Sequence, residues 1–198
     1  MRLIELRLKN LNSLKGEWHI DFTNPAFVNE GIFAITGQTG AGKTTILDAI
    51  CLALYSRTPR LGDITGSTNE MMTQGCGECS AEVVIEIGDK HYRCSWYQHR
   101  AHKKARGNLL PIRHEVSDVK STKILEEKKS KTASYIQQLI GMDFQQFTRS
   151  IMLAQGSFAA FLKSDIADRA AILEKITGTA IYAQISKNVF EKKTGRGS

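Results

Sequence analysis

The sequence predicts an α/β fold in which a glycine-rich loop joins a strand to a helix, an antiparallel β region follows, and the C-terminal part is helical. Three observations lead to this prediction. An apolar run at 32–35 enters the glycines of 37–42, and apolar residues then recur at helical spacing through Leu54. Apolar and polar residues alternate over 2–10 and again over 81–97. From residue 123 onward the apolar residues follow a helical period.

The glycine loop carries the strongest functional signal. Gly37, Gly42, Lys43 and Thr44 fit the pattern G-x-x-x-x-G-K-[ST] of a phosphate-binding loop. Its glycines let backbone N–H groups turn inward around a triphosphate, which the positive end of the following helix also faces. Lys43 would reach the β and γ phosphates, and the Thr44 hydroxyl is placed to ligate Mg²⁺. The alternative is a glycine-rich turn that binds nothing.

Composition indicates an ordinary globular protein. Of 198 residues 41% are hydrophobic and 24% charged, which suits one domain with or without an extension. No apolar run approaches the roughly 20 residues of a membrane span, and the first residues lack a signal-peptide pattern, so we expect a cytoplasmic protein with no membrane partner. The formal charge of +7 favours a polyanionic partner such as nucleic acid.

The elements follow in order along the chain. Strands at 2–10 and 18–22 form a hairpin, and Asn24-Pro25 ends it before the glycine loop. Residues 56–80 are rich in glycine and hydroxyl groups, which predicts a long surface loop. Strands at 81–87, 92–97 and 111–119 make an antiparallel region, in which we expect Trp96 and Tyr92 to face the core.

Helices are predicted in the last third of the chain. One carries Ile136, Leu139 and Ile140 and is closed by Gly141, and Asp143 opens the next, with Phe144, Phe147 and Ile151. Further helices are expected at 166–176 and 180–193. Residues 194–198 resemble a cloning remnant.

A catalytic acid is missing from the pattern. A P-loop ATPase needs an acidic residue at the end of an apolar strand, and usually a carboxylate that activates water. Residues 83–86, Val-Val-Ile-Glu, come nearest, but they continue as an alternating strand and are rejected. The remaining groups would therefore come from another chain or from a distant part of a longer one.

Four segments carry a family resemblance: RLKNLNSLKGEWHIDF at 7–22, FAITGQTGAGKTTILDAICLALY at 33–55, FTRSIMLAQGSFAAFL at 147–162 and EKITGTAIYAQIS at 174–186. They resemble the N-terminal half of SbcC-type proteins, a family of SMC-like DNA-repair ATPases. The resemblance implies a P-loop NTPase of the ABC-ATPase type, with residues 1–179 as the N-terminal lobe of a split head and 180–193 as the start of a coiled-coil helix. The signature motif and the Walker B acid would lie on a C-terminal lobe.

The resemblance also implies site residues and ligands. ATP and Mg²⁺ would be bound, and Lys43 and Gln155 would be catalytic, with Gln155 and Thr44 also at the metal. A neutral carboxamide such as Gln155 can contact both Mg²⁺ and the attacking water. Asn12 and Ser13 would contact the nucleotide from the first hairpin. The phosphate loop comprises Gly37, Gln38, Thr39, Gly40, Ala41, Gly42, Lys43, Thr44 and Thr45.

The implied partners are the C-terminal lobe, a second ATPase head in a homodimer, the nuclease SbcD and double-stranded DNA. ATP hydrolysis in the complete protein would regulate exonuclease and endonuclease activity in DNA repair, and the present segment alone would be inactive. Two alternatives stay open: a small-molecule or nucleotide kinase, and a non-enzymatic DNA tether that ATP stabilises.

Three further features of the sequence concern charge and cysteine. Basic residues at the second hairpin either touch DNA or form a solvated tip: Arg93, Arg100, Lys103, Lys104 and Arg106. A second basic run, 120–131, is predicted to be an exposed helix face. Cys76 and Cys79 have the C-x-x-C spacing of half a zinc site, and we interpret them as loop thiols because a structural site needs four ligands.

Overall fold

The computed structural model describes residues 1–28, 34–65 and 67–148. The chain divides into two compact units, residues 1–144 and 145–198, and only 145–148 of the second are described. Gln155, Ile151 and the helices expected at 166–176 and 180–193 lie outside the described residues.

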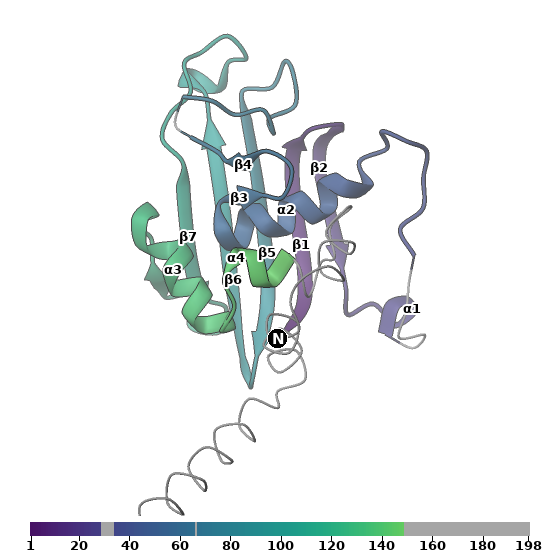
Figure 1. The fold of residues 1–198 in the computed structure, drawn as a ribbon, viewed down its shortest axis with the longest axis vertical. Helices are drawn as coiled ribbons and strands as arrows, with labels where there is room; N and C mark the ends of the chain where they lie inside the picture. The colour runs from purple at the N-terminus through teal and green to yellow at the C-terminus, as the bar shows by residue number, and fades with distance from the viewer. Residues whose placement is uncertain (29–33, 66, 149–198) are drawn as a thin grey trace, which may run out of the picture. The chain divides into compact units, whose positions relative to one another are not determined.

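The centre of the first unit is one antiparallel sheet of six strands, in the order β2-β1-β5-β6-β7-β8 (Figure 1). The two hairpins predicted from the sequence are thus parts of one sheet, because β1 pairs with β5. A separate pair, β3-β4, follows the glycine-loop helix. The strand bounds are β1 Arg2–Leu11, β2 Leu14–Asp21, β3 Arg57–Thr58, β4 Gly62–Asp63, β5 Glu78–Ile87, β6 Lys90–His99, β7 Arg113–Asp118 and β8 Ile124–Glu126.

Apolar rows cross one face of this sheet because the strand registers align alternate residues. One row joins Leu8, Ala81, Trp96 and His114, and all four are buried. The next row joins Leu6, Val83, Cys94 and Val116, also buried. Trp96 therefore faces the core as predicted, whereas Tyr92 is only partly buried. Burying such rows supplies the main driving force for the fold.

Helix α2, Lys43–Tyr55, lies across this face (Figure 1). Two side chains of the sheet fix its C-terminal half: His114 Nε2 donates to the Ala53 carbonyl at 2.9 Å, and Trp96 Nε1 donates to Ser56 Oγ at 3.0 Å. Burial lowers the pKa of His114, so the ring is neutral and its Nε2 carries the proton. The helix predicted after the glycine loop is thereby confirmed and placed.

The apolar stripe expected on α2 is only partly right. Ile50 and Leu54 are buried, but Ile46 and Leu47 are half-buried, and the charged Asp48 is completely buried. The reason is that, among the described residues, the first turn of α2 is covered on the side of Leu14 and Asn12.

Two expectations for loops and strands need correction. Of the strand expected at 32–35, residues 32 and 33 lie outside the described residues. Residues 34–38 form no strand, and Ile35 is 43% exposed, because no described strand runs beside them to accept their hydrogen bonds. Residues 56–80 are not merely a surface loop, since they contain β3, β4 and the start of β5. Ile64, Met71 and Met72 within them are buried.

Helices close the described part. Helix α3, Lys129–Ile140, ends at Gly141, whose φ of +73° and N–H bond to the Gln137 carbonyl confirm the predicted cap. The basic run at 120–131 is only partly helical, because β8 occupies 124–126. The short helices are α1 Pro25–Val28, η1 Ala101–Lys103 and α4 Phe144–Phe147. Nowhere in the described part is a helix both long and apolar enough to cross a bilayer.

A candidate nucleotide site at the glycine loop

The glycine loop has a backbone shape that other residues adopt only with strain. Gly40 and Gly42 have φ values of +85° and +93°, in the left-handed region. Gly42 also packs against β2, since a Cβ at this position would lie 2.7 Å from both Cγ and Cδ2 of Leu14. Gly40 and Gly42 are therefore needed for the conformation of the loop, and Gly42 also for its contact with the first hairpin.

The start of α2 leaves backbone donors for an anion. Gly42 occupies the N-cap position and no side chain caps the helix. The first N–H groups of a helix have no acceptor within the helix, so they need oxygen atoms from elsewhere. Phosphate oxygens suit them because the helix dipole adds a favourable field there.

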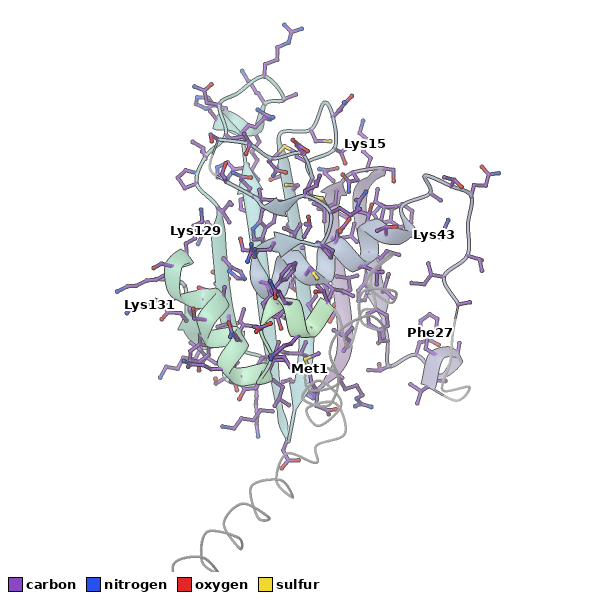
Figure 2. The ribbon with its side chains drawn as sticks, in the orientation of Figure 1. Met1, Lys15, Phe27, Lys43, Lys129 and Lys131 are labelled. Carbon is purple, nitrogen blue, oxygen red and sulfur yellow. The ribbon has the colours of Figure 1, made fainter. Side chains whose placement is uncertain are left out.

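Lys43 is folded back over the loop. Its Nζ donates to the carbonyls of Gly37 at 2.7 Å and Gln38 at 2.9 Å. Figure 2 shows the residue at the N-terminal end of α2. The ammonium group is thus held at the glycine loop by two neutral acceptors, for which phosphate oxygens of higher charge can substitute.

The structure brings Asn12 to this loop from the β1–β2 turn. Asn12 Nδ2 lies 3.4 Å from Thr45 Oγ1, in the first turn of α2, and Ser13 is exposed beside it. Thr45 is buried, whereas Thr44 is half-buried. Of the two adjacent threonines, Thr44 is therefore the one with accessible surface for a metal-bound ligand. Gln155, the other metal residue expected, lies outside the described residues.

The donor set fits magnesium held mainly by phosphate. Within the described ranges, no three His, Cys, Asp or Glu side chains are grouped to hold a metal ion. Mg²⁺ keeps several waters and needs only one or two protein oxygens beside phosphate, and the Thr44 hydroxyl can supply one.

The two cysteines of the C-x-x-C segment differ in environment. Cys79 is buried, accepts a hydrogen bond from Asn69 at 3.3 Å, and burial raises its pKa to about 12. Cys76 is partly exposed, and both are free thiols. A thiol with so high a pKa is a poor metal ligand at neutral pH.

An ion pair between the buried Asp48 of α2 and the exposed Arg60 was missed from the sequence. Asp48 Oδ2 accepts from Arg60 Nε at 3.0 Å and Nη2 at 2.5 Å, while Oδ1 has no partner among the described residues. Burial raises the pKa of Asp48, and Arg60 opposes that rise. The sequence signal that could have indicated this pair is the carboxylate of Asp48 with an apolar residue on either side of it in the helix.

Three of the five residues of the basic cluster have polar partners, two of them carboxylates. Arg93 pairs with Glu82 at 3.2 Å, Lys103 with Glu78 at 2.9 Å, and Arg100 Nη1 donates to the Gly107 carbonyl at 3.0 Å. Lys104 and Arg106 are exposed and have no ion pair within the described part of the chain. These two residues form what we call the basic tip.

Comparisons with known proteins agree with the motifs. The chain is 41% identical to the SbcC subunit of the nuclease SbcCD from Pseudomonas aeruginosa and 33% identical to that from Rhodobacter capsulatus, over 97% of its own length in both cases. It is 31% identical over 90% of its length to the probable DNA double-strand break repair Rad50 ATPase of Aquifex aeolicus. In each case the chain spans 17% of the relative. The resemblance to SbcC inferred from the sequence is thus confirmed.

A solved structure described as "Structural biochemistry of ATP-driven dimerization and DNA stimulated activation of SMC ATPases" aligns with 89% of this chain and 99% of its own. Its TM-score of 0.48 at 18% identity carries no weight for function. The AAA domain family matches residues 5–194, which include the whole glycine loop and α2. The chain therefore belongs to the AAA domain family.

Proposed function

We propose that this chain is the ATP-binding N-terminal lobe of an SbcC-type DNA-repair ATPase. The observation that carries the proposal is the glycine loop, whose left-handed glycines, uncapped helix and folded-back Lys43 are together suited to cradle phosphate. The similarity to SbcC proteins over 97% of the chain supports the same assignment.

Different residues around the loop would bind different parts of the Mg²⁺–ATP complex. Lys43 would exchange its two carbonyl acceptors for oxygens of the β and γ phosphates, and the N–H groups at the start of α2 would bind the same chain of phosphates. Thr44 would hold Mg²⁺, which neutralises phosphate charge during transfer. Asn12 would contact the nucleotide from the hairpin side, since it already touches the helix at Thr45.

Hydrolysis would need a second lobe. The sequence has no acidic residue closing an apolar strand, and Gln155 alone cannot serve as a general base. The exposed segment around Ile35 supports the same division, because it has no strand neighbour among the described residues. A C-terminal lobe that supplies a neighbouring strand and the missing acid would complete the site.

The wider assembly follows from the same proposal. Two heads would pair around ATP, and their opening on hydrolysis would regulate an SbcD-type nuclease acting on double-stranded DNA ends in the cytoplasm. Of the basic residues, Lys104 and Arg106 at the basic tip are the best candidates for phosphate contacts, because the others already have partners.

Nucleotide binding by the 198-residue chain tests the proposal. Calorimetric titration with ATP and Mg²⁺ should show one site, and Lys43→Ala should weaken binding at least about thirtyfold, since a charged hydrogen-bonding group contributes about 2 kcal/mol or more. Lys129→Ala is the matched control, because Lys129 lies on α3 and should leave ATP binding unchanged. Equal binding by Lys43→Ala and the unsubstituted chain would contradict the proposal.

A further inference from the structure

We propose that Thr73 is a positioning residue for ATP binding, which acts by holding Asn12 against the glycine-loop helix. The inference rests on the proposed function, because it takes Asn12 as a residue that contacts the nucleotide. It adds a role for the segment 69–73, which lies outside every sequence motif of the site.

The backbone of Asn12 is held on both sides by this segment. Its N–H donates to the Met71 carbonyl at 2.7 Å, and its carbonyl accepts from Thr73 Oγ1 at 2.8 Å. The Thr73 N–H donates in turn to the Asn10 carbonyl at 2.9 Å. Residues 71–73 therefore run antiparallel beside the β1–β2 turn, and a bridge between Leu11 and Met72 lies between the two hydrogen bonds.

Asn12 has an uncommon backbone conformation that these bonds support. Its φ is +47°, in the left-handed region, which residues with a Cβ adopt rarely and asparagine more readily than most. Residues in such conformations persist where their surroundings hold them. From this position the Asn12 side chain reaches Thr45 Oγ1 at 3.4 Å and Met71 Sδ at the same distance.

The segment itself is anchored in the sheet. Asn69 Oδ1 accepts from the N–H groups of Met71 and Met72, both at 2.9 Å, and Asn69 Nδ2 donates to Gln98 Oε1 at 2.7 Å. Gln98 is completely buried on β6 and donates to two further carbonyls, those of Thr65 and Leu110. The segment that carries Thr73 is thus tied to the sheet through Asn69 and Gln98, in addition to its bonds with the β1–β2 turn.

Removing the Thr73 hydroxyl should therefore weaken ATP binding without disturbing the fold. Thr73→Val keeps the shape and the backbone N–H and loses only the bond to the Asn12 carbonyl. We expect ATP to bind about fivefold more weakly, the factor that corresponds to one hydrogen bond of ordinary net strength. Thr73→Ser keeps the hydroxyl and should restore binding to within about twofold.

The control is a threonine with the same kind of bond far from the loop. Thr132 Oγ1 donates to the His114 carbonyl at 2.9 Å, and Thr132 is buried on α3. Thr132→Val should lower the melting temperature and leave the Kd for ATP unchanged. A general loss of stability would weaken ATP binding in both valine variants, so the pair separates positioning from stability.

A double-mutant cycle tests whether Thr73 acts through Asn12. In an Asn12→Ala background, Thr73→Val should change the Kd for ATP by less than about twofold, because the side chain to be positioned is gone. An unchanged Kd in Thr73→Val, or equal effects of Thr73→Val with and without the Asn12 side chain, would overturn the inference. The proposed function would still stand in that case if ATP binding depends on Lys43. Absence of ATP binding by the unsubstituted chain would overturn both.

If Thr73→Val does not fold, Asn69→Ala gives the same test, because it removes the acceptor that holds Met71 and Met72. Folding of each variant is checked by circular dichroism before titration. Weaker ATP binding by Asn69→Ala that disappears in the Asn12→Ala background supports the inference, and unchanged binding overturns it.

Discussion

Because Gly42 packs against Leu14, Gly42→Ala should destabilise the fold more than a glycine-to-alanine substitution elsewhere in the glycine loop. The added Cβ would lie 2.7 Å from Leu14 Cγ as well as from Cδ2. Rotating the terminal methyl groups of Leu14 cannot clear the Cγ contact, so β2 or α2 must shift. Overpacking of this kind costs about 1–3 kcal/mol.

The backbone adds a second cost. Gly42 has a φ of +93°, and an L-residue in the left-handed region loses about 1–2 kcal/mol. The two costs together predict that Gly42→Ala lowers the free energy of unfolding by about 2–5 kcal/mol. Gly40→Ala is the matched control: its φ is +85°, but nothing lies within 4 Å of the added Cβ, so only about 1–2 kcal/mol should be lost.

Urea denaturation of both variants measures the difference. In a Leu14→Ala background the cost of Gly42→Ala should fall to that of Gly40→Ala, because the clash is gone and the backbone strain remains. Equal destabilisation by Gly42→Ala and Gly40→Ala in the unsubstituted chain would refute the packing argument.

Three further predictions concern charges. Arg60→Ala should lower the free energy of unfolding by about 3 kcal/mol at pH 7, because it leaves the buried Asp48 carboxylate unpaired. Since burial raises the pKa of Asp48, this loss of stability should shrink as the pH falls and the acid is protonated. A constant loss in urea titrations from pH 7 to 4 would contradict this. Lys103, Lys9 and Tyr97 lower the pKa of Glu78 to about 2, so the stability that Glu78 contributes is fully present above pH 4.5 and is lost as the pH falls toward 2. Glu78→Gln should flatten this part of the acid-denaturation curve, and an unchanged curve would count against the ion pairs. Lys104→Ala should weaken binding to duplex DNA and reduce the slope of log binding constant against log salt concentration by about 0.9. Lys103→Ala should have less effect, because Glu78 already neutralises Lys103. Filter binding at several salt concentrations compares the two variants, and a larger effect of Lys103→Ala would point to a different DNA-contacting surface.

Local patterns predicted the glycine-loop helix, the hairpins and the cap at Gly141 because each depends on a few neighbouring residues. The motif at 37–44, followed by apolar residues at helical spacing, indicates a turn and a helix start, and alternation over 81–97 indicates paired strands. The union of both hairpins in one sheet depends on pairing between β1 and β5, which lie far apart along the chain, and no local pattern reports it.

The predictions that need correction have a common cause in tertiary contacts. The run at 32–35 is apolar enough for a strand, but a strand needs a neighbour, and the part of it that the structure describes, residues 34 and 35, has none among the described strands. Residues 56–80 lack periodicity, yet Met71 and Ile64 are buried because Asn69 and Gln98 organise the loop through side-chain bonds. Such bonds between distant residues leave no repeat in the sequence.

The residues of the candidate site also differ in how far the sequence predicts them. The loop residues could be predicted because the motif indicates phosphate binding, whereas the approach of Asn12 to the loop was implied only by the family resemblance. The pair of Asp48 and Arg60 could not be predicted, since Arg60 lies twelve positions away on an irregular segment. Thr73 was not predicted at all, because its hydroxyl bonds a backbone carbonyl sixty-one positions away, and a backbone acceptor leaves no mark in the sequence.

The central claim is that this chain holds ATP but cannot hydrolyse it without a second lobe. The direct measurement is ATP binding and phosphate release by the same purified 198-residue sample, with and without a separately expressed C-terminal lobe of an SbcC-type protein. We expect ATP binding that depends on Lys43, negligible phosphate release alone, and turnover when the second lobe is added. Rapid hydrolysis by the chain alone, or no turnover at any ratio of the two lobes, would contradict this claim.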